Sequence, residues 1–255
     1  MEIKVLGCSG AEFPGHYPTG FLVDGRILLD AGTLNSVLNA KEQLKVKNIF
    51  ITHAHLDHTR EIPFLADNLF IGSHKQKVNI FSISPVIRDI KNNILNRKVW
   101  PDMTVLPNAR DPLIGLNVMK PYTPLQIEGY SVTAYKVNHS VPAVGYLVED
   151  RKGRRFFYTG DTGPTAMTWE KIGEKKIHGL IIESSFPNRL EEMAMMTGHL
   201  TPGLLKKELL KMKCIPERIY VTHLKPQFHK AISREFQKLG MRNLILLKEG
   251  DSIRV

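Results

Sequence analysis

The 255-residue sequence contains only two cysteines, Cys8 and Cys214. Two isolated thiols form neither a disulfide framework nor a zinc site built on cysteine pairs, so both are expected to be reduced. The sequence also lacks an apolar run of about 18 residues, which excludes a transmembrane helix by length. Residues 1–7 lack the apolar run and cleavage site of a secretory signal. We therefore expect a cytoplasmic protein that does not associate with a membrane.

Acidic residues are scarce relative to basic ones. The chain has 35 lysines and arginines against 25 aspartates and glutamates, a formal charge of +10. Such an excess attracts nucleotides, nucleic acid or phosphorylated metabolites. Aromatic residues make up only 8%, and the basic clusters at 151–155 and 206–207 are not interleaved with them as in a single-strand binding surface. Each cluster is therefore interpreted as solvated surface.

The remaining composition is that of an ordinary globular protein, with 42% hydrophobic and 24% charged residues. We find no internal repeat, low-complexity tract or flexible linker, so residues 1–255 are expected to form a single domain. Asp24-Gly25 between two apolar runs predicts a hairpin. Residues 98–128 hold five prolines and little periodicity, which predicts an excursion over the surface.

Apolar periodicity predicts alternating strands and helices, and hence an α/β protein. The predicted strands are 2–7, 21–23, 26–30, 47–51, 78–83, 130–136, 143–149, 154–159, 177–182, 218–222 and 243–247. The predicted helices are 34–43, 84–97, 189–196, 202–211 and 229–239. Two sheets packed face to face, with helices outside, would fit this order.

One motif carries the strongest chemical information: His53-Ala54-His55-Leu56-Asp57-His58 places four potential metal ligands within six residues, one residue after a buried strand. A helix would place two ligands four residues apart, whereas this spacing suits an irregular loop that serves two centres. Imidazole and carboxylate suit zinc, and also manganese or iron. Two metal ions sharing the segment is the easier geometry, because one ion would be left without an open position.

Three further ligand-type residues follow at the ends of apolar strands: His139, Asp161 and His223. Asp161 lies within Gly160-Asp161-Thr162-Gly163, where glycines let the backbone approach closely. Strand ends are rigid mounts for metal ligands. Taken in order after the first motif, these residues are more informative than any of them alone.

The order of these ligands resembles the metallo-β-lactamase superfamily, over nearly the whole chain. The resemblance implies an αββα four-layer sandwich with two divalent ions at one edge. It assigns His53, His55 and His139 to the first ion, and Asp57, His58 and His223 to the second, with Asp161 bridging both. It also makes Asp30 the carboxylate that braces the motif loop.

Two such ions would hold a hydroxide as nucleophile. Two divalent ions, two carboxylates (Asp57 and Asp161) and hydroxide leave a site charge near +1, which suits a small anionic phosphodiester. Glu183 ends an apolar strand, and His199 precedes a predicted helix. A histidine paired with a carboxylate has a raised pKa and can protonate an alkoxide leaving group. The predicted catalytic set is therefore His199, Glu183 and Asp57.

Several segments narrow the resemblance to class II cyclic-nucleotide phosphodiesterases. They are the His53 motif with its Leu56, residues 96–102, residues 183–189 and Gly198-His199-Leu200-Thr201-Pro202. Thr59-Arg60-Glu61 departs from that family, which has an apolar residue and then Gly or Ser after the motif. The resemblance implies hydrolysis of 3′,5′-cyclic nucleotides to nucleoside 5′-monophosphates.

Two alternatives remain open. A tRNA 3′-end-processing nuclease also carries paired Glu and His segments, and the charge of +10 suits RNA, although no long basic arm for gripping tRNA is evident. A non-catalytic nucleic-acid-binding protein would have a degenerate site, whereas all seven expected ligands are present. Zinc is the default metal, with manganese or iron as alternatives, and a homodimer is compatible with the sequence.

Overall fold

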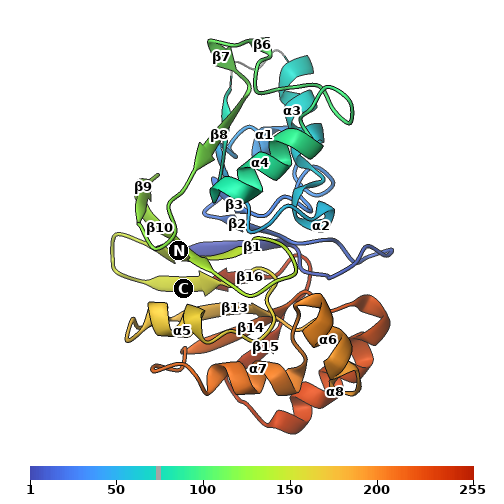
Figure 1. Ribbon diagram of the computed structural model, residues 1–255, viewed down its shortest axis with the longest axis vertical. Coiled ribbons are helices and arrows are strands. Elements are labelled where there is room, and N and C mark those ends of the chain that lie inside the picture. The colour runs from blue at the N-terminus through green and yellow to red at the C-terminus, as the bar shows by residue number, and fades with distance from the viewer. Residues whose placement is uncertain (73–75) are drawn as a thin grey trace.

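The computed structural model describes residues 1–72 and 76–255 and contains two seven-stranded sheets that pack against each other (Figure 1). The first sheet has the order β16-β1-β2-β3-β4-β5-β8. Its strands are β1 (Glu2–Gly7), β2 (Gly20–Val23), β3 (Ile27–Leu29), β4 (Asn48–Phe50), β5 (Val78–Ser82), β8 (Ile114–Val118) and β16 (Ser252–Arg254).

The second sheet has the order β15-β14-β13-β12-β11-β10-β9. Its strands are β9 (Leu125–Ile127), β10 (Tyr130–Lys136), β11 (Val144–Glu149), β12 (Arg155–Tyr158), β13 (Gly179–Glu183), β14 (Arg218–Thr222) and β15 (Leu244–Leu246). A small separate ribbon pairs β6 (Pro107–Asn108) with β7 (Asp111–Pro112).

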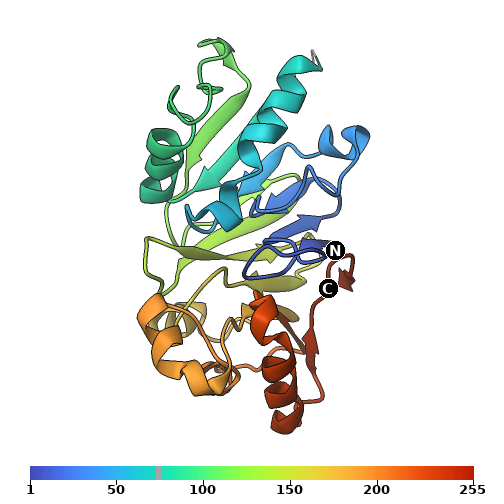
Figure 2. The ribbon, with the colours of Figure 1, turned by 90° about the vertical axis from the view of Figure 1, so that its right-hand side faces the viewer.

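Helices cover the outer face of each sheet, which gives four layers (Figures 1 and 2). On the first sheet lie α1 (Ala40–Gln43), α3 (Ile62–Ile71) and α4 (Ser84–Asn93), and on the second lie α5 (Met167–Ile172), α6 (Glu191–Thr197), α7 (Pro202–Leu209) and α8 (His229–Leu239). The short helix α2 (Leu56–Thr59) lies at one edge, between the two sheets. The α/β sandwich predicted from the sequence is therefore confirmed.

Parallel pairing places the strand ends that precede the predicted metal ligands at one edge of the sheets. β3, β4, β5 and β8 are parallel in the first sheet, and β12 to β15 are parallel in the second. Carboxyl ends of parallel strands meet at the same edge, where the loops that follow them can share a site. The two sheets bury a core between them in which Phe50 stacks on Phe81 at 4.9 Å and meets the edge of Tyr146.

Several predicted elements have different bounds in the structure. The helix expected at 34–43 is confined to α1, because Asn39 caps it and the amides of Leu34 and Asn35 donate to the Glu61 carboxylate instead. The helix expected to reach 97 ends at Asn93. The stretch 98–128 is not only a surface excursion, since it contains β6, β7, β8 and β9.

Outside that stretch, α2, α3, α5 and β16 were not predicted either. Within the described part of the chain, no helix is long and apolar enough to cross a membrane. The predicted hairpin is present, with β2 and β3 joined through Asp24 and Gly25, both at positive φ.

Candidate metal centre

The His-rich motif is held at the end of β4 by a buried carboxylate. Asp30 follows β3 and accepts hydrogen bonds from the Thr52 amide (2.8 Å) and the Thr52 hydroxyl (2.9 Å). It also accepts from the Tyr158 hydroxyl of the second sheet at 2.7 Å. Asp30 has no exposed surface, so it is rigidly fixed. The structure thus confirms that Asp30 braces the motif.

The motif is not wholly a loop. Residues 53–55 are irregular, but α2 begins at Leu56, so Asp57 and His58 lie on a short helix. The backbone there passes so close to Gly32 that a Cβ on that glycine would lie 1.9 Å from the Asp57 carbonyl oxygen. A side chain at position 32 would therefore displace the helix that carries two of the predicted ligands.

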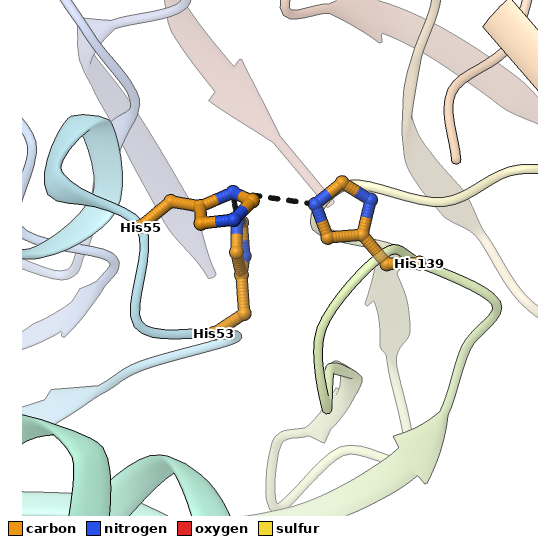
Figure 3. Close-up of side chains that lie close together, drawn as sticks. All are labelled: His53, His55 and His139. Carbon is orange, nitrogen blue, oxygen red and sulfur yellow. Dashed lines mark hydrogen bonds between the residues drawn. The ribbon is translucent and has the colours of Figure 1, made fainter. Parts of the chain in front are cut away.

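Three imidazoles converge on one side of the centre. His53 and His55 come from the loop after β4, and His139 comes from the loop after β10 (Figure 3). His55 Nδ1 lies 3.0 Å from His53 Nε2 and 3.4 Å from His139 Nε2. These three nitrogens form one of the groups in the described chain that could hold a metal ion.

A second group lies beside the first and comprises Asp57, His58, Asp161 and His223. His223 Nε2 lies 3.3 Å from the Asp57 carboxylate and 3.4 Å from Asp161 Oδ1. The other oxygen of Asp161 lies 3.4 Å from His58 Nε2 and 3.7 Å from His53 Nε2. Asp161 is therefore the carboxylate that faces both groups, as the predicted bridging position requires.

Hydrogen bonds on the outer side of each ring fix which nitrogen faces inward. His58 Nδ1 donates to Asp30 Oδ2 at 2.8 Å, and His139 Nδ1 donates to the Gly198 carbonyl at 2.8 Å. A carboxylate and a carbonyl can only accept, so these Nδ1 atoms carry the protons and the Nε2 lone pairs face the centre. His53 Nδ1 is similarly bonded to the Thr52 hydroxyl.

Two buried atoms support the presence of a cation. Among the residues that the structure describes, His58 Nε2 and Asp161 Oδ1 are buried without a hydrogen-bond partner. A buried polar atom without a partner is costly, and here both are metal-ligand types that point into the same cluster. The residues present therefore fit two divalent ions.

The charges of the centre agree with this fit. Burial lowers the pKa values of His53, His55 and His139, which keeps these imidazoles neutral and able to bind metal. Burial alone would also lower the pKa of His58, but the carboxylates of Asp161, Asp30 and Asp57 raise it well above its usual range. The same negative field would attract a metal cation in place of that proton.

The predicted Glu183–His199 pair lies directly beside the second group. Glu183 ends β13 and has no exposed surface, and its Oε1 lies 2.6 Å from His199 Nδ1. Although burial opposes it, the Glu183 carboxylate raises the pKa of His199 to about 9. The His199 ring stacks on His223 with 5.5 Å between centroids. His199 also belongs to two of the potential metal-binding groups. Its position is therefore compatible with two roles, proton donor and metal ligand.

Two residues that the sequence did not single out organise this pair. The Ser185 hydroxyl lies 2.9 Å from Glu183 Oε2, 3.2 Å from His199 Nδ1 and 2.9 Å from His223 Nδ1. Gly198 adopts a left-handed conformation at φ 72°, and a Cβ there would lie about 3 Å from His139. The sequence of residues 183–189 resembles a segment of cyclic-nucleotide phosphodiesterases, but nothing in it indicates that Ser185 contacts His223.

The departure from the family at Thr59-Arg60-Glu61 has a structural explanation. Arg60 donates to the Gly32 carbonyl at 2.9 Å and pairs with Glu12 in the loop after β1. Glu61 accepts the amides of Leu34 and Asn35. These two side chains tie three loops around the centre together.

Comparison with known proteins agrees with this geometry. A sequence-family model described as the β-lactamase superfamily domain matches residues 25–224. A probable 3′,5′-cyclic-nucleotide phosphodiesterase of Yersinia pestis is 30% identical, and the alignment covers 81% of this chain and 67% of that protein. A ribonuclease Z of Methanococcus aeolicus is 29% identical over 60% of this chain and 48% of that protein.

The fold is shared with a solved structure from yeast. The crystal structure of unliganded yeast PDE1 superposes with a TM-score of 0.84 at 17% identity, covering 100% of this chain and 99% of that one. At this identity the likeness establishes the common fold alone.

Proposed function

The chain belongs to the metallo-β-lactamase superfamily, and we propose that within it the protein hydrolyses 3′,5′-cyclic nucleotides to nucleoside 5′-monophosphates. A metal-dependent hydrolase is the function that the family and the His/Asp clusters support. The observation that carries the finer proposal is the Glu183–His199 pair beside two adjacent ligand groups, with Asp161 of the second group also facing His53 of the first.

In this proposal His53, His55 and His139 would hold one divalent ion, and Asp57, His58 and His223 would hold the other. Asp161 faces both groups of ligands and would serve both. Divalent ions held there supply Lewis-acid chemistry, which lowers the pKa of water and neutralises the charge that develops on a phosphoryl group. Zinc suits these ligands, and manganese and iron are the alternatives.

His199 supplies the proton for the leaving group. Its Nδ1 is bonded to Glu183, so Nε2 is the atom that can donate. With a pKa raised to about 9, the ring is an imidazolium at neutral pH. During hydrolysis the oxygen of water bonds to phosphorus, the bond between phosphorus and O3′ breaks, and O3′ takes the proton from His199. The attacking water gives up a proton to the solvent, and His199 regains one from the solvent before the next turnover.

Hydrogen bonds from three other groups fix Glu183 in position. The Thr162 amide, the Leu200 amide and the Ser185 hydroxyl donate to its carboxylate at 3.0, 3.2 and 2.9 Å. These bonds hold the carboxylate against Nδ1 of His199, where it stabilises a positive charge on that ring.

The test is a screen of the metal-loaded protein against 3′,5′-cyclic AMP and GMP, bis(p-nitrophenyl) phosphate and a precursor tRNA. The proposal expects turnover of cyclic nucleotides to 5′-monophosphates. Absence of that turnover in protein that cleaves the activated diester would refute the substrate, though not the metal centre.

A second candidate is processing of tRNA 3′ ends. The ribonuclease Z relative and the net charge of +10 favour it. Cleavage of precursor tRNA with no action on cyclic nucleotides would establish it. Retention of all seven ligand-type residues in one cluster counts against a non-catalytic nucleic-acid-binding protein.

A further inference from the structure

Two cations lie beyond His199 at the rim of the centre, each over an aromatic ring. Lys225 Nζ lies 5.3 Å from the centroid of Phe186, and the guanidinium of Arg189 lies 5.5 Å from the centroid of Phe228. The two rings are 6.2 Å apart, and Phe186 lies 5.8 Å from His199. We call these four residues, Phe186, Arg189, Lys225 and Phe228, the cation–aromatic strip.

Neither cation of the strip is in an ion pair within the described parts of the chain. Other basic groups are paired, for example Arg155 with Glu149 and Lys91 with Asp102. Lys225 donates one hydrogen bond, to the Gly10 carbonyl at 3.1 Å. An ammonium has three donors, so Lys225 retains two for an anion.

The acidic groups near the strip are already engaged. Glu183 is bonded to His199, and Glu235 accepts the Asn188 amide at 2.8 Å. Arg189 is exposed, and Lys225 and Phe228 are half-buried, so an incoming ligand can reach them, whereas Phe186 is buried beneath Lys225. The strip therefore offers two accessible cations and the half-buried Phe228 ring, and the buried Phe186 connects them to His199.

The position of these pairs matters more than their number. Cation–aromatic pairs occur about once per 70–80 residues in proteins, so a few in a chain of this length are ordinary. Here the Lys225–Phe186 pair adjoins His199, and the Arg189–Phe228 pair lies next to it. Positive charge combined with aromatic rings is the surface that binds single-stranded nucleic acid. The sequence did not predict it, because Phe186 and Arg189 are far along the chain from Lys225 and Phe228.

We propose that the cation–aromatic strip binds the 5′-terminal nucleotide of a short linear oligonucleotide, so that the protein also cleaves linear strands that begin with a 5′-phosphate. This inference rests on the proposed function. A cyclic nucleotide has one phosphate, which the metal centre takes, and so it leaves the two cations unused. A linear strand places its reacting phosphodiester at the centre and its 5′-phosphate on Lys225 and Arg189.

The reaction is the same hydrolysis on a longer substrate. For the dinucleotide pApA, the oxygen of water bonds to the internal phosphorus, and the bond from that phosphorus to O3′ breaks. His199 protonates O3′, and the products are two molecules of AMP. For ApA, which lacks the 5′-phosphate, the products are adenosine and AMP, and the cations have no partner.

The experiment compares kcat/KM for pApA and ApA in the metal-loaded protein, with cyclic AMP alongside. We expect pApA to be preferred at least about tenfold, the factor that corresponds to ~1.4 kcal/mol. Lys225→Met and Arg189→Met should each reduce this ratio toward one, and Lys225→Arg should keep it. The control is Lys176→Met, because Lys176 is exposed and paired with Glu217 at the amino ends of β13 and β14, the edge opposite the metal centre; this variant should keep the ratio.

A binding measurement separates recognition from catalysis. His199→Ala protein should bind pApA more tightly than ApA, and Lys225→Met in that background should abolish the difference. Equal kcat/KM values for the two dinucleotides, or a Lys225→Met defect of the same size on both, would overturn the subsite. Turnover of cyclic AMP in either case would leave the proposed function intact, whereas turnover of pApA without cyclic AMP would refute the proposed function alone.

Discussion

Replacing Glu183 with Gln should make the activity depend on pH in a way that can be calculated. Glu183 is the main cause of the raised pKa of His199, which is about 9. Glutamine keeps the size of the side chain and one acceptor oxygen but removes the charge. Without that charge the pKa of His199 falls to its ordinary value of about 6.5 or lower, because burial opposes protonation.

The size of the effect follows from the fraction of His199 that carries a proton. At pH 8 a group with a pKa of about 9 is about 90% protonated, whereas one with a pKa of about 6.5 is about 3% protonated. The variant should therefore lose at least about 30-fold in kcat at pH 8. At pH 6 both forms are mostly protonated, and the loss should be under about twofold if the pKa is near 6.5.

The assay is a pH profile of kcat for both proteins on cyclic AMP and on bis(p-nitrophenyl) phosphate. The alkaline limb of the profile should move to lower pH in the variant for cyclic AMP. The loss of activity in the variant should be smaller for bis(p-nitrophenyl) phosphate, because p-nitrophenolate leaves without a proton. A defect of the same size at pH 6 and pH 8 would show that Glu183 does not act through the charge of His199.

Four further outcomes follow from the centre. Purified protein should contain close to two transition-metal ions per chain, and a content of zero or one that added metal does not raise would contradict two sites. Asp161→Ala should lose more activity and metal than His55→Ala, because Asp161 faces both ligand groups; near-normal turnover in Asp161→Ala would refute the bridging role. His199→Ala should keep both metals and lose about 10²–10⁴-fold in kcat on cyclic AMP, and loss of a metal ion would show instead that His199 is a ligand. Asp30→Ala should lower metal affinity about 10–100-fold, measured by competition with a chelator, since it frees the rings of His58 and the motif.

Sequence reasoning located the chemistry of the centre well. The His53 motif, His139, Asp161 and His223 were selected as ligand types at strand ends, and the structure brings all seven residues together. Their roles as ligands stay a prediction. Each of these ligands is recognisable from a local pattern, an apolar strand followed by a polar residue, that lies within one short segment of the sequence.

Features set by distant contacts could not be predicted in this way. Leu34 and Asn35 fit a helical pattern, but their amides bond to Glu61, which lies 27 and 26 residues away. Ser185 contacts His223 across 38 residues, and Lys225 reaches the Gly10 carbonyl across 215. No local periodicity carries such information, because these contacts form only when segments far apart in the chain come together in the fold.

The division of the seven ligand-type residues between the sheets has a consequence for assembly. His53, His55, Asp57 and His58 follow β4 of the first sheet, whereas His139, Asp161 and His223 follow β10, β12 and β14 of the second. Neither sheet alone holds a complete ligand group. A growing chain that has emerged only as far as β8 therefore offers a partial set, and full coordination must wait until the second sheet has docked. Metal ions bound by ligands from both sheets would hold the two sheets together. Each tenfold excess of free ion over its dissociation constant would add about 1.4 kcal/mol to the stability of the folded protein.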